Sequence, residues 1–412
     1  MAPQTAEVDN GRVDDEANVL AFPQAPEAIE LRHLRAFVAV AEELNFGRAA
    51  ERLYITQPAL SRQIRALEQL LGCELLRRST HRVELTIAGE ALLARTRPLL
   101  REVDAAVSAA QSVGGELAGR VARLWEPVIQ ATVADADLQE QRMAYEAMHA
   151  QFSLPPEVEV RAVNAHGVPS LLVARQPDDP PTLLYLHGGG YVLGSAFGYR
   201  PLVGAVAVAA DTGALAPDYR LAPEHPFPAA IDDALSAYRW MLERGVDAGQ
   251  VTMAGDSSGG GLVVSLLVRL KELGLPQPGG AILFCPWVDL ALELAERRTE
   301  EARAVARAAA AAYLAGHPAD DPIASPLGAD LTGLAPLLIQ AATGDAHLTD
   351  AEALTDHATR HGVDARLELY PVDAHVFQFF WSFLPDAAEA IQAAGRFAGR
   401  VRAPGTSQAG SG

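Results

Sequence analysis

Several residue types are scarce in this chain of 412 residues, and each scarcity excludes a class of protein. Cys73 and Cys285 are the only cysteines, fall in different predicted domains and lack metal-ligand spacing. They therefore argue against a disulfide framework or a zinc cluster and fit a cytoplasmic protein with reduced thiols. Lys271 is the single lysine against 32 arginines, a skew to which we attach no structural meaning.

Long hydrophobic runs are also missing. No apolar run approaches the roughly 18 residues that a membrane-spanning helix needs. The start, MAPQTAEVDNGRVDDEANVL, lacks the basic region and apolar core of a secretory signal. We expect no membrane segment and no export.

Positive charge is scarce overall but not everywhere. The formal net charge of −19 argues against broad affinity for nucleic acid. Residues 31–103 nevertheless carry twelve Arg and eight Glu, a net charge of +4, which leaves −23 on the remainder. Any DNA-binding region is therefore expected in the N-terminal quarter. Apolar residues make up 49% of the chain, enough for two or three domains with sizeable cores.

The N-terminal quarter has the pattern of a winged helix-turn-helix domain over residues 29–86. Residues 1–28 are acidic and aperiodic and are expected to form a disordered arm. From Leu31 to Glu43 apolar residues recur at helical spacing, and two short helices and a basic, β-prone segment over residues 77–86 follow. These features predict three helices and a wing.

A long helix is expected over residues 87–113. Its small and apolar residues alternate in steps of four and three, at Leu92, Thr96, Leu99, Val103, Ala106 and Ala110. Such a seam is typical of helices that pair, so we expect a homodimer through this helix, with packing on its own domain as the alternative.

The second helix of the motif NFGRAAERLYITQPALSRQIRALEQLLG is expected to enter the major groove. Thr56 is a plausible N-cap, with Pro58 in the first turn. Gln57 can read adenine, and Arg62 or Arg65 can read guanine or grip phosphate. The residues expected on or near the groove-facing surface are Gln57, Pro58, Ala59, Ser61, Arg62 and Arg65. The further phosphate candidates are Arg48 in the preceding helix and Arg77, Arg78 and Arg82 in the wing.

The segment FVAVAEELNFGRAAERLYITQPALSRQIRALEQLLGCELLRRSTHRVELTIAGEALL closely resembles the N-terminal domain of LysR-type transcriptional regulators, over about residues 30–112. The resemblance implies a dimer built on the linker helix and a palindromic double-stranded DNA operator. LysR regulators continue into a two-lobed effector domain like a periplasmic binding protein. Nothing after Gly114 resembles one.

The rest of the chain has the pattern of an α/β domain over residues 137–402. Gly114, Gly115 and Gly119 predict a linker over residues 114–136, and an amphipathic helix follows from Asp137 to Phe152. From Val158 strands alternate with helices, which predicts a mostly parallel sheet covered on both faces, with the first strands pairing antiparallel. Residues 403–412 are expected to form a disordered tail.

A G-x-S-x-G pattern, GDSSGG, follows the predicted strand VTMAGD and opens a helix. A sharp turn in that context exposes the central serine, so Ser257 is the expected nucleophile. Upstream, HGGGY follows another strand, and we expect the amides of Gly188, Gly189 and Ser258 to form an oxyanion hole. Downstream, His375 follows the last predicted strand, where it could act as general base toward Ser257.

These motifs, with PDYRLAPEHPFPAAIDDAL and ASPLGADLTGL, resemble the hormone-sensitive-lipase group of α/β-hydrolases over about residues 140–400. The resemblance implies hydrolysis of short or medium acyl esters through an acyl-serine intermediate, without a metal or organic cofactor. It also implies a lid built partly from the helix over residues 137–152.

The acid of the triad departs from the family pattern. The family places it two positions before a leucine, in G-x-D-P-L-x-D or G-x-x-E-x-L-x-D, and in GDAHLTD that position is Ala346. Asp345 is one residue away and is the expected acid, while Asp350, Asp289 or no acid at all stay open. Loss of the acid would lower turnover by about four orders of magnitude.

Three functions fit these features. The favoured one is a LysR-type regulator fused to a serine carboxylesterase. The alternative is a regulator whose hydrolase-like domain senses a small ester or acid ligand with slow or no turnover. In the third, the N-terminal domain only dimerises the hydrolase.

Overall fold

The chain folds as two compact units, residues up to 104 and residues from 105 onward, which are described separately. The computed structural model describes residues 29–53, 55–78, 83–113, 115–133, 137–176, 180–294 and 299–403. The predicted arm over residues 1–28, and all of the predicted tail except Ala403, lie outside the described residues.

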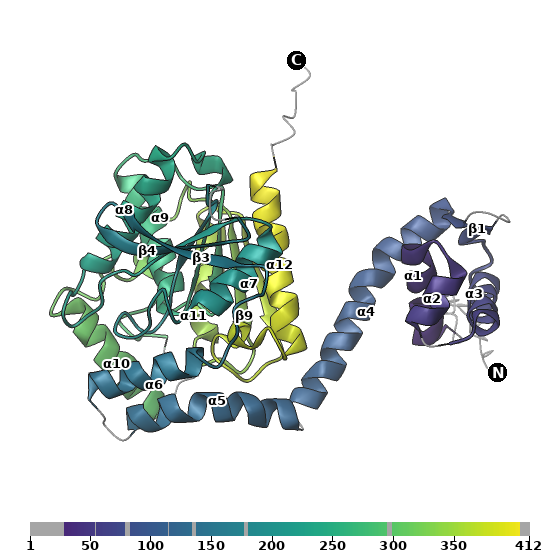
Figure 1. Cartoon of the computed structure of the whole chain (residues 1–412), viewed down its shortest axis with the longest axis horizontal. Coiled ribbons are helices and arrows are strands. Elements are labelled where there is room, and N and C mark those ends of the chain that lie inside the picture. The colour runs from purple at the N-terminus through teal and green to yellow at the C-terminus, as the bar shows by residue number, and fades with distance from the viewer. Residues whose placement is uncertain are drawn as a thin grey trace, which may run out of the picture. The chain divides into compact units, whose positions relative to one another are not determined.

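The N-terminal unit is a winged helix-turn-helix, as predicted (Figure 1). Asn45 caps α2 by accepting from the amides of Gly47 and Arg48, and Thr56 caps α3 by accepting from the Ala59 amide at 3.4 Å. Two short antiparallel strands form the wing, with Leu76 opposite Leu85. The elements are α1 (Leu31–Glu43), α2 (Phe46–Arg52), α3 (Gln57–Leu71), β1 (Leu76–Arg78), β2 (Val83–Leu85) and α4 (Ile87–Val113).

The predicted seam of α4 has a buried part and an exposed part. Leu92 packs against the apolar core of the N-terminal unit, and Thr96 is almost fully buried. Leu99, by contrast, is 47% exposed. The beginning of the seam therefore packs on its own domain, as in the alternative prediction, whereas Leu99 does not.

The second unit contains an eight-stranded sheet in the order β10-β9-β8-β7-β5-β6-β4-β3. The pairs β3–β4 and β4–β6 are antiparallel and the other five are parallel, so the prediction of a mostly parallel sheet with antiparallel first strands is confirmed. The strands are β3 (Glu159–Ala165), β4 (Val168–Ala174), β5 (Leu183–Leu186), β6 (Ala214–Pro217), β7 (Thr252–Asp256), β8 (Gly280–Phe284), β9 (Leu337–Ala342) and β10 (Ala365–Tyr370).

Helices cover both faces of this sheet (Figure 1). Side chains alternate along the strands, so that Leu184 and Leu186 join one apolar layer while Leu183 and Tyr185 join the other. Among the described residues, none of the helices combines the length and apolar character needed to cross a bilayer. On the first face, α8 (Ala229–Glu243), α9 (Ser258–Glu272) and α11 (Leu348–Arg360) contact the strands, and α10 (Glu300–Leu314) packs into the same apolar cluster. On the second face, α7 (Arg200–Ala210) and α12 (Pro385–Arg402) contact the strands, and α5 (Glu116–Val133) and α6 (Leu138–His149) pack into the same apolar cluster.

The expected linker over residues 114–136 is wrong for most of its length, because residues 116–133 form α5. Val121, Leu124 and Val128 recur at helical spacing and are buried in the core of the second unit. Burial of this apolar face outweighs the low helix propensity of Gly119. The hydrolase unit therefore begins before residue 137, and its N-terminal part consists of two helices, α5 and α6.

Candidate active site

The strand β7 and the helix α9 meet at Ser257, which adopts the left-handed backbone conformation φ +50°. The turn is tight: a Cβ on Gly259 would lie 2.2 Å from the Leu186 carbonyl oxygen, and one on Gly255 would lie 2.5 Å from the Gly259 carbonyl oxygen. Glycine on both sides of the serine is thus a steric requirement, as the motif predicts. The turn presents Ser257 at the carboxyl edge of the parallel strands.

The structure brings Ser257, His375 and Asp345 into one hydrogen-bonded chain. His375 Nε2 lies 2.8 Å from Ser257 Oγ. On the other side of the ring, His375 Nδ1 lies 3.0 Å and 2.9 Å from the two carboxylate oxygens of Asp345. Ser257 follows β7, Asp345 follows β9 and His375 follows β10, so the carboxyl ends of three strands supply the three groups, with β8 between β7 and β9 in the sheet.

The two other candidate acids are engaged elsewhere. The Asp350 carboxylate accepts from the amides of Val288 and Asp289. The Asp289 carboxylate accepts from the Leu294 amide at 2.7 Å. Asp345 is therefore the carboxylate that faces His375, although the position expected from the family pattern is Ala346.

Asp345 is held as an anion by its neighbours. Burial alone would raise the pKa of this carboxyl, but the charge of His375 and hydrogen bonds from His347 and His375 hold the pKa well below its usual range. Its side chain is fully buried. An ionised Asp345 can accept the Nδ1–H of His375, which leaves Nε2 of the neutral ring free to accept a proton.

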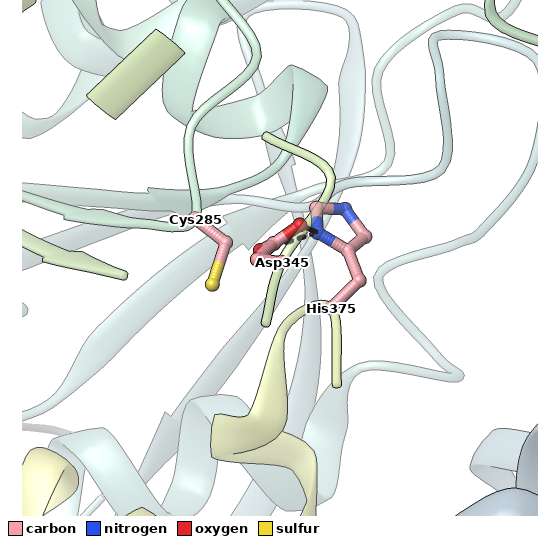
Figure 2. Close-up of side chains that lie close together, drawn as sticks. All are labelled: Cys285, Asp345 and His375. Atoms are coloured by element: carbon pink, nitrogen blue, oxygen red, sulfur yellow. Dashed lines mark hydrogen bonds and ion pairs between the residues drawn. The ribbon is translucent and has the colours of Figure 1, made fainter. Parts of the chain in front are cut away.

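The Cys285 thiol lies beside the Asp345 carboxylate. Figure 2 shows its thiol beside Asp345 and His375, and one sulfur, oxygen or nitrogen atom from each residue lies within 4.8 Å of the others. These donors could in principle hold a metal ion, but burial raises the pKa of the Cys285 thiol, which disfavours the thiolate that a metal requires. The arrangement fits a hydrogen-bonded carboxylate better than a metal centre.

In the glycine loop after β5 (residues 187–190), one of the predicted oxyanion amides is engaged elsewhere. The Gly188 amide donates to Asp256 Oδ1 at 3.0 Å and cannot also serve an oxyanion, so its predicted role is wrong. Among the described residues, no protein acceptor is recorded for the amides of Gly189, Gly190 and Ser258. Gly189 and Gly190 have φ values of +105° and +63°, which turn the loop past Gly188. The oxyanion donors are therefore better assigned to Gly189, Gly190 and Ser258.

A buried carboxylate anchors this loop. Asp256 is fully buried and accepts from the hydroxyls of Tyr185 and Tyr199, both at 2.9 Å, in addition to Gly188. Burial raises the pKa of Asp256 to about 6, although the hydrogen bonds from Tyr199 and Tyr185 oppose the rise. Tyr199 also lies 2.8 Å, oxygen to oxygen, from Tyr145 of α6. The network joins the residue before the nucleophile to the oxyanion loop and to α6.

The predicted DNA-reading residues lie on α3 and the elements around it. Gln57, Pro58, Arg62 and Arg65 are exposed, whereas Ala59 and Ser61 are partly exposed. In the wing, Arg77 is exposed and Arg78 also lies in β1, while Arg82 falls outside the described residues.

Arg48 is the phosphate candidate of α2. It is exposed, but its Nε lies 3.2 Å from Glu43 Oε2. This ion pair would compete with a DNA phosphate, so Arg48 is a weaker candidate than Arg62 or Arg65.

Comparison with known proteins identifies both units. Residues 183–379 match the model of the alpha/beta hydrolase fold family. A protein named acetyl-hydrolase from Streptomyces hygroscopicus is 41% identical over 272 residues, which cover 64% of this chain and 90% of that relative. A crystal structure of an esterase from the bacterial hormone-sensitive lipase family superimposes with a TM-score of 0.63 at 36% identity, covering 68% of this chain and 98% of that one. The chain belongs to the bacterial hormone-sensitive lipase family.

This hormone-sensitive lipase family member carries an additional N-terminal domain. Residues 31–90 match the model of the bacterial regulatory helix-turn-helix proteins of the lysR family, so the chain is a LysR-type helix-turn-helix domain fused to an α/β-hydrolase. Another solved structure, that of EstE5 soaked with p-nitrophenyl butyrate, has a TM-score of 0.62 at 34% identity and covers 68% of this chain and 99% of that one.

Two parts of the hydrolase site escaped the sequence analysis. Asp256 stands directly before Ser257, at the end of a largely apolar strand. An acidic residue in that position indicates a carboxylate with buried hydrogen-bond partners. Gly190 was the third of three glycines, and spacing alone did not show which two amides face the nucleophile.

Proposed function

We propose that this protein is a serine carboxylesterase acting on short or medium acyl esters, tethered to an operator-binding domain. The observation that carries the esterase assignment is the chain of contacts from Ser257 Oγ through His375 to Asp345. The relatives named acetyl-hydrolase and esterase support an ester as the substrate.

The first half-reaction follows from this geometry. His375 Nε2 takes the Ser257 hydroxyl proton while Oγ attacks the ester carbonyl carbon, and Asp345 stabilises the imidazolium that forms. The oxyanion receives hydrogen bonds from Gly189, Gly190 and Ser258, at the positive end of α9. As the bond to the alcohol breaks, His375 returns its proton to the leaving oxygen.

The second half-reaction repeats the same steps with water. His375 removes a proton from water, hydroxide attacks the acyl-serine carbonyl, and the collapsing intermediate expels Ser257 Oγ, which regains the proton from His375. The products are the free acid and the starting enzyme, so no cofactor is consumed in this scheme.

The assignment is tested by hydrolysis of p-nitrophenyl acetate and butyrate by the full chain. We expect Ser257→Ala to abolish turnover, and Asp345→Asn to lower kcat by about four orders of magnitude because the wrong imidazole tautomer is favoured. Asp364→Asn, a change of an exposed carboxylate before β10, is the matched control and should leave kcat unchanged. Equal background rates for wild type and Ser257→Ala would overturn the assignment and favour the ligand sensor.

We further propose that α3 reads an operator and that α4 holds two copies together on its two half-sites. Exposure of Gln57, Arg62 and Arg65 along one helix, with Arg77 in the wing, supports a groove-binding surface. The acidic hydrolase unit would not itself attract DNA, so the interaction should stay local to the N-terminal unit.

Fluorescence anisotropy with DNA flanking the gene tests this second assignment. Arg62→Ala should weaken binding. If Arg62 contacts a phosphate, the slope of the logarithm of the binding constant against the logarithm of the salt concentration should also become shallower by about one. Arg307→Ala, an exposed arginine of α10, should change nothing. Equal binding to scrambled DNA of the same length would instead favour a domain that only dimerises the hydrolase.

A further inference from the structure

A second histidine lies against the His375–Asp345 pair. The His347 ring stacks on the His375 ring, with centroids 4.4 Å apart and planes inclined by 26°. The His347 side chain is only 16% exposed, and Trp287 flanks it at a centroid distance of 6.1 Å. This ring helps to hold the pKa of Asp345 low, but it takes no proton in the proposed reaction.

His347 also closes the turn that carries the acid. Its amide donates to Asp345 Oδ1 at 2.9 Å, which makes an Asx turn of residues 345–347 and fixes the carboxylate toward His375. This turn explains how an acid one residue before the expected position still faces the imidazole. The contact comes from the backbone, so it does not depend on the side chain at residue 347.

The side chain contributes mainly through its flat face. His347 Nδ1 lies 3.5 Å from Asp345 Oδ1, a long contact that helps to hold the pKa of this carboxyl low but does not fix the plane of the His375 ring. The stack, by contrast, covers one face of the His375 ring, whose side chain remains 27% exposed. His375 can face Ser257 and Asp345 at once in only one ring orientation, and a flat neighbour restricts its rotation out of that plane.

We propose that His347 is a positioning residue for the reaction: its imidazole lies flat on His375 and holds the ring in the plane that joins Ser257 to Asp345. The role rests on the proposed esterase function, because it concerns the orientation of the general base. It requires an aromatic face at residue 347 rather than a nitrogen atom.

The test compares His347→Phe, which keeps a flat ring, with His347→Leu and His347→Ala, which do not, all in the full chain. Two quantities are measured: kcat and KM for p-nitrophenyl acetate, and the low-field proton resonance of His375 Nδ1–H in its hydrogen bond to Asp345. We expect His347→Leu and His347→Ala to lower kcat about 10- to 100-fold with KM within about threefold, and to broaden or abolish the resonance. His347→Phe should restore both. His361→Ala, just after the same helix, should match wild type.

Two results would overturn the proposal. One is wild-type kcat and an intact resonance in His347→Leu, and the other is a defect in His347→Phe as large as in His347→Leu. Thermal unfolding of each variant shows which of them are folded, and the comparison of Phe with Leu holds even where Ala fails to fold. A wild-type protein without esterase activity would refute the proposed function, while the resonance would still report on the role of His347.

Discussion

The Asp256 carboxylate accepts a hydrogen bond from the Gly188 amide at 3.0 Å. This contact fixes the glycine loop of residues 187–190 to the turn that carries Ser257. A Cβ at Gly188 would lie 2.2 Å from Asp256 Oδ2. The two motifs, almost 70 residues apart in sequence, therefore meet through a contact that has no space for a side chain.

Replacing Gly188 should damage catalysis more than binding. We expect Gly188→Ala to push the loop away from Asp256 and lower kcat for p-nitrophenyl acetate by about 100-fold or more, since loss of one oxyanion donor alone costs that much. Gly399→Ala, in α12 with open space around its Cα, is the control and should leave kcat unchanged. Wild-type kcat in Gly188→Ala would show that the contact with Asp256 does not position the loop.

Asp256 should make stability depend on pH. Its pKa in the fold is raised to about 6 by burial, above the value of about 4 in an unfolded chain. The fold therefore binds this proton more tightly than the unfolded chain does, and the resulting stability is present below about pH 4 and lost as pH rises to about 6. Asn cannot ionise, so Asp256→Asn should gain stability relative to wild type across that window. Urea unfolding of both proteins at pH 4, 5, 6 and 7 measures the difference, and a constant difference would contradict the assigned pKa.

Helix α5 should stabilise the hydrolase unit. Leu124 is 8% exposed in the core that contains Trp125 and Phe379, so Leu124→Ala should lower the free energy of unfolding of this unit by about 2–4 kcal/mol. Ile129 of the same helix is 49% exposed, and Ile129→Ala should stay within about 0.5 kcal/mol of wild type. The relevant urea transition is the one in which esterase activity disappears, because the two units need not unfold together. Equal effects of the two substitutions would argue that α5 is not part of the folded core.

The exposed part of the α4 seam should control the oligomeric state. Leu99→Glu places a charge at the centre of the proposed dimer contact and should convert the dimer to a monomer in light scattering. Leu273→Glu, at an exposed leucine of the second unit, should not. A wild-type protein that is already monomeric at micromolar concentration would refute dimerisation through α4.

Much of the fold follows from patterns that are local in sequence. The helix-turn-helix and the strand–turn–helix around Ser257 were predicted because caps, glycines and apolar spacing act within a few residues. The helix α5 was not predicted, because the nearby glycines indicated a linker. The core that buries Leu124 is assembled from segments that are distant in sequence.

The candidate site divides in the same way. Ser257 and His375 could be chosen by their places after strands, whereas the engagement of Gly188 depends on Asp256, 68 residues away. The choice of Asp345 over Ala346 likewise depends on a turn closed by the His347 amide. Neither contact leaves a signal in the spacing of one motif.

Because the apolar face of α5 is buried in the hydrolase core, the point at which the helix-turn-helix domain and the hydrolase can be recombined lies before Glu116 rather than at residue 136. A transplant of this hydrolase onto another DNA-binding domain would have to carry α5 with it. A chimera joined after α5 would leave behind the helix that fills one side of the enzyme, and would expose the apolar surface that α5 covers.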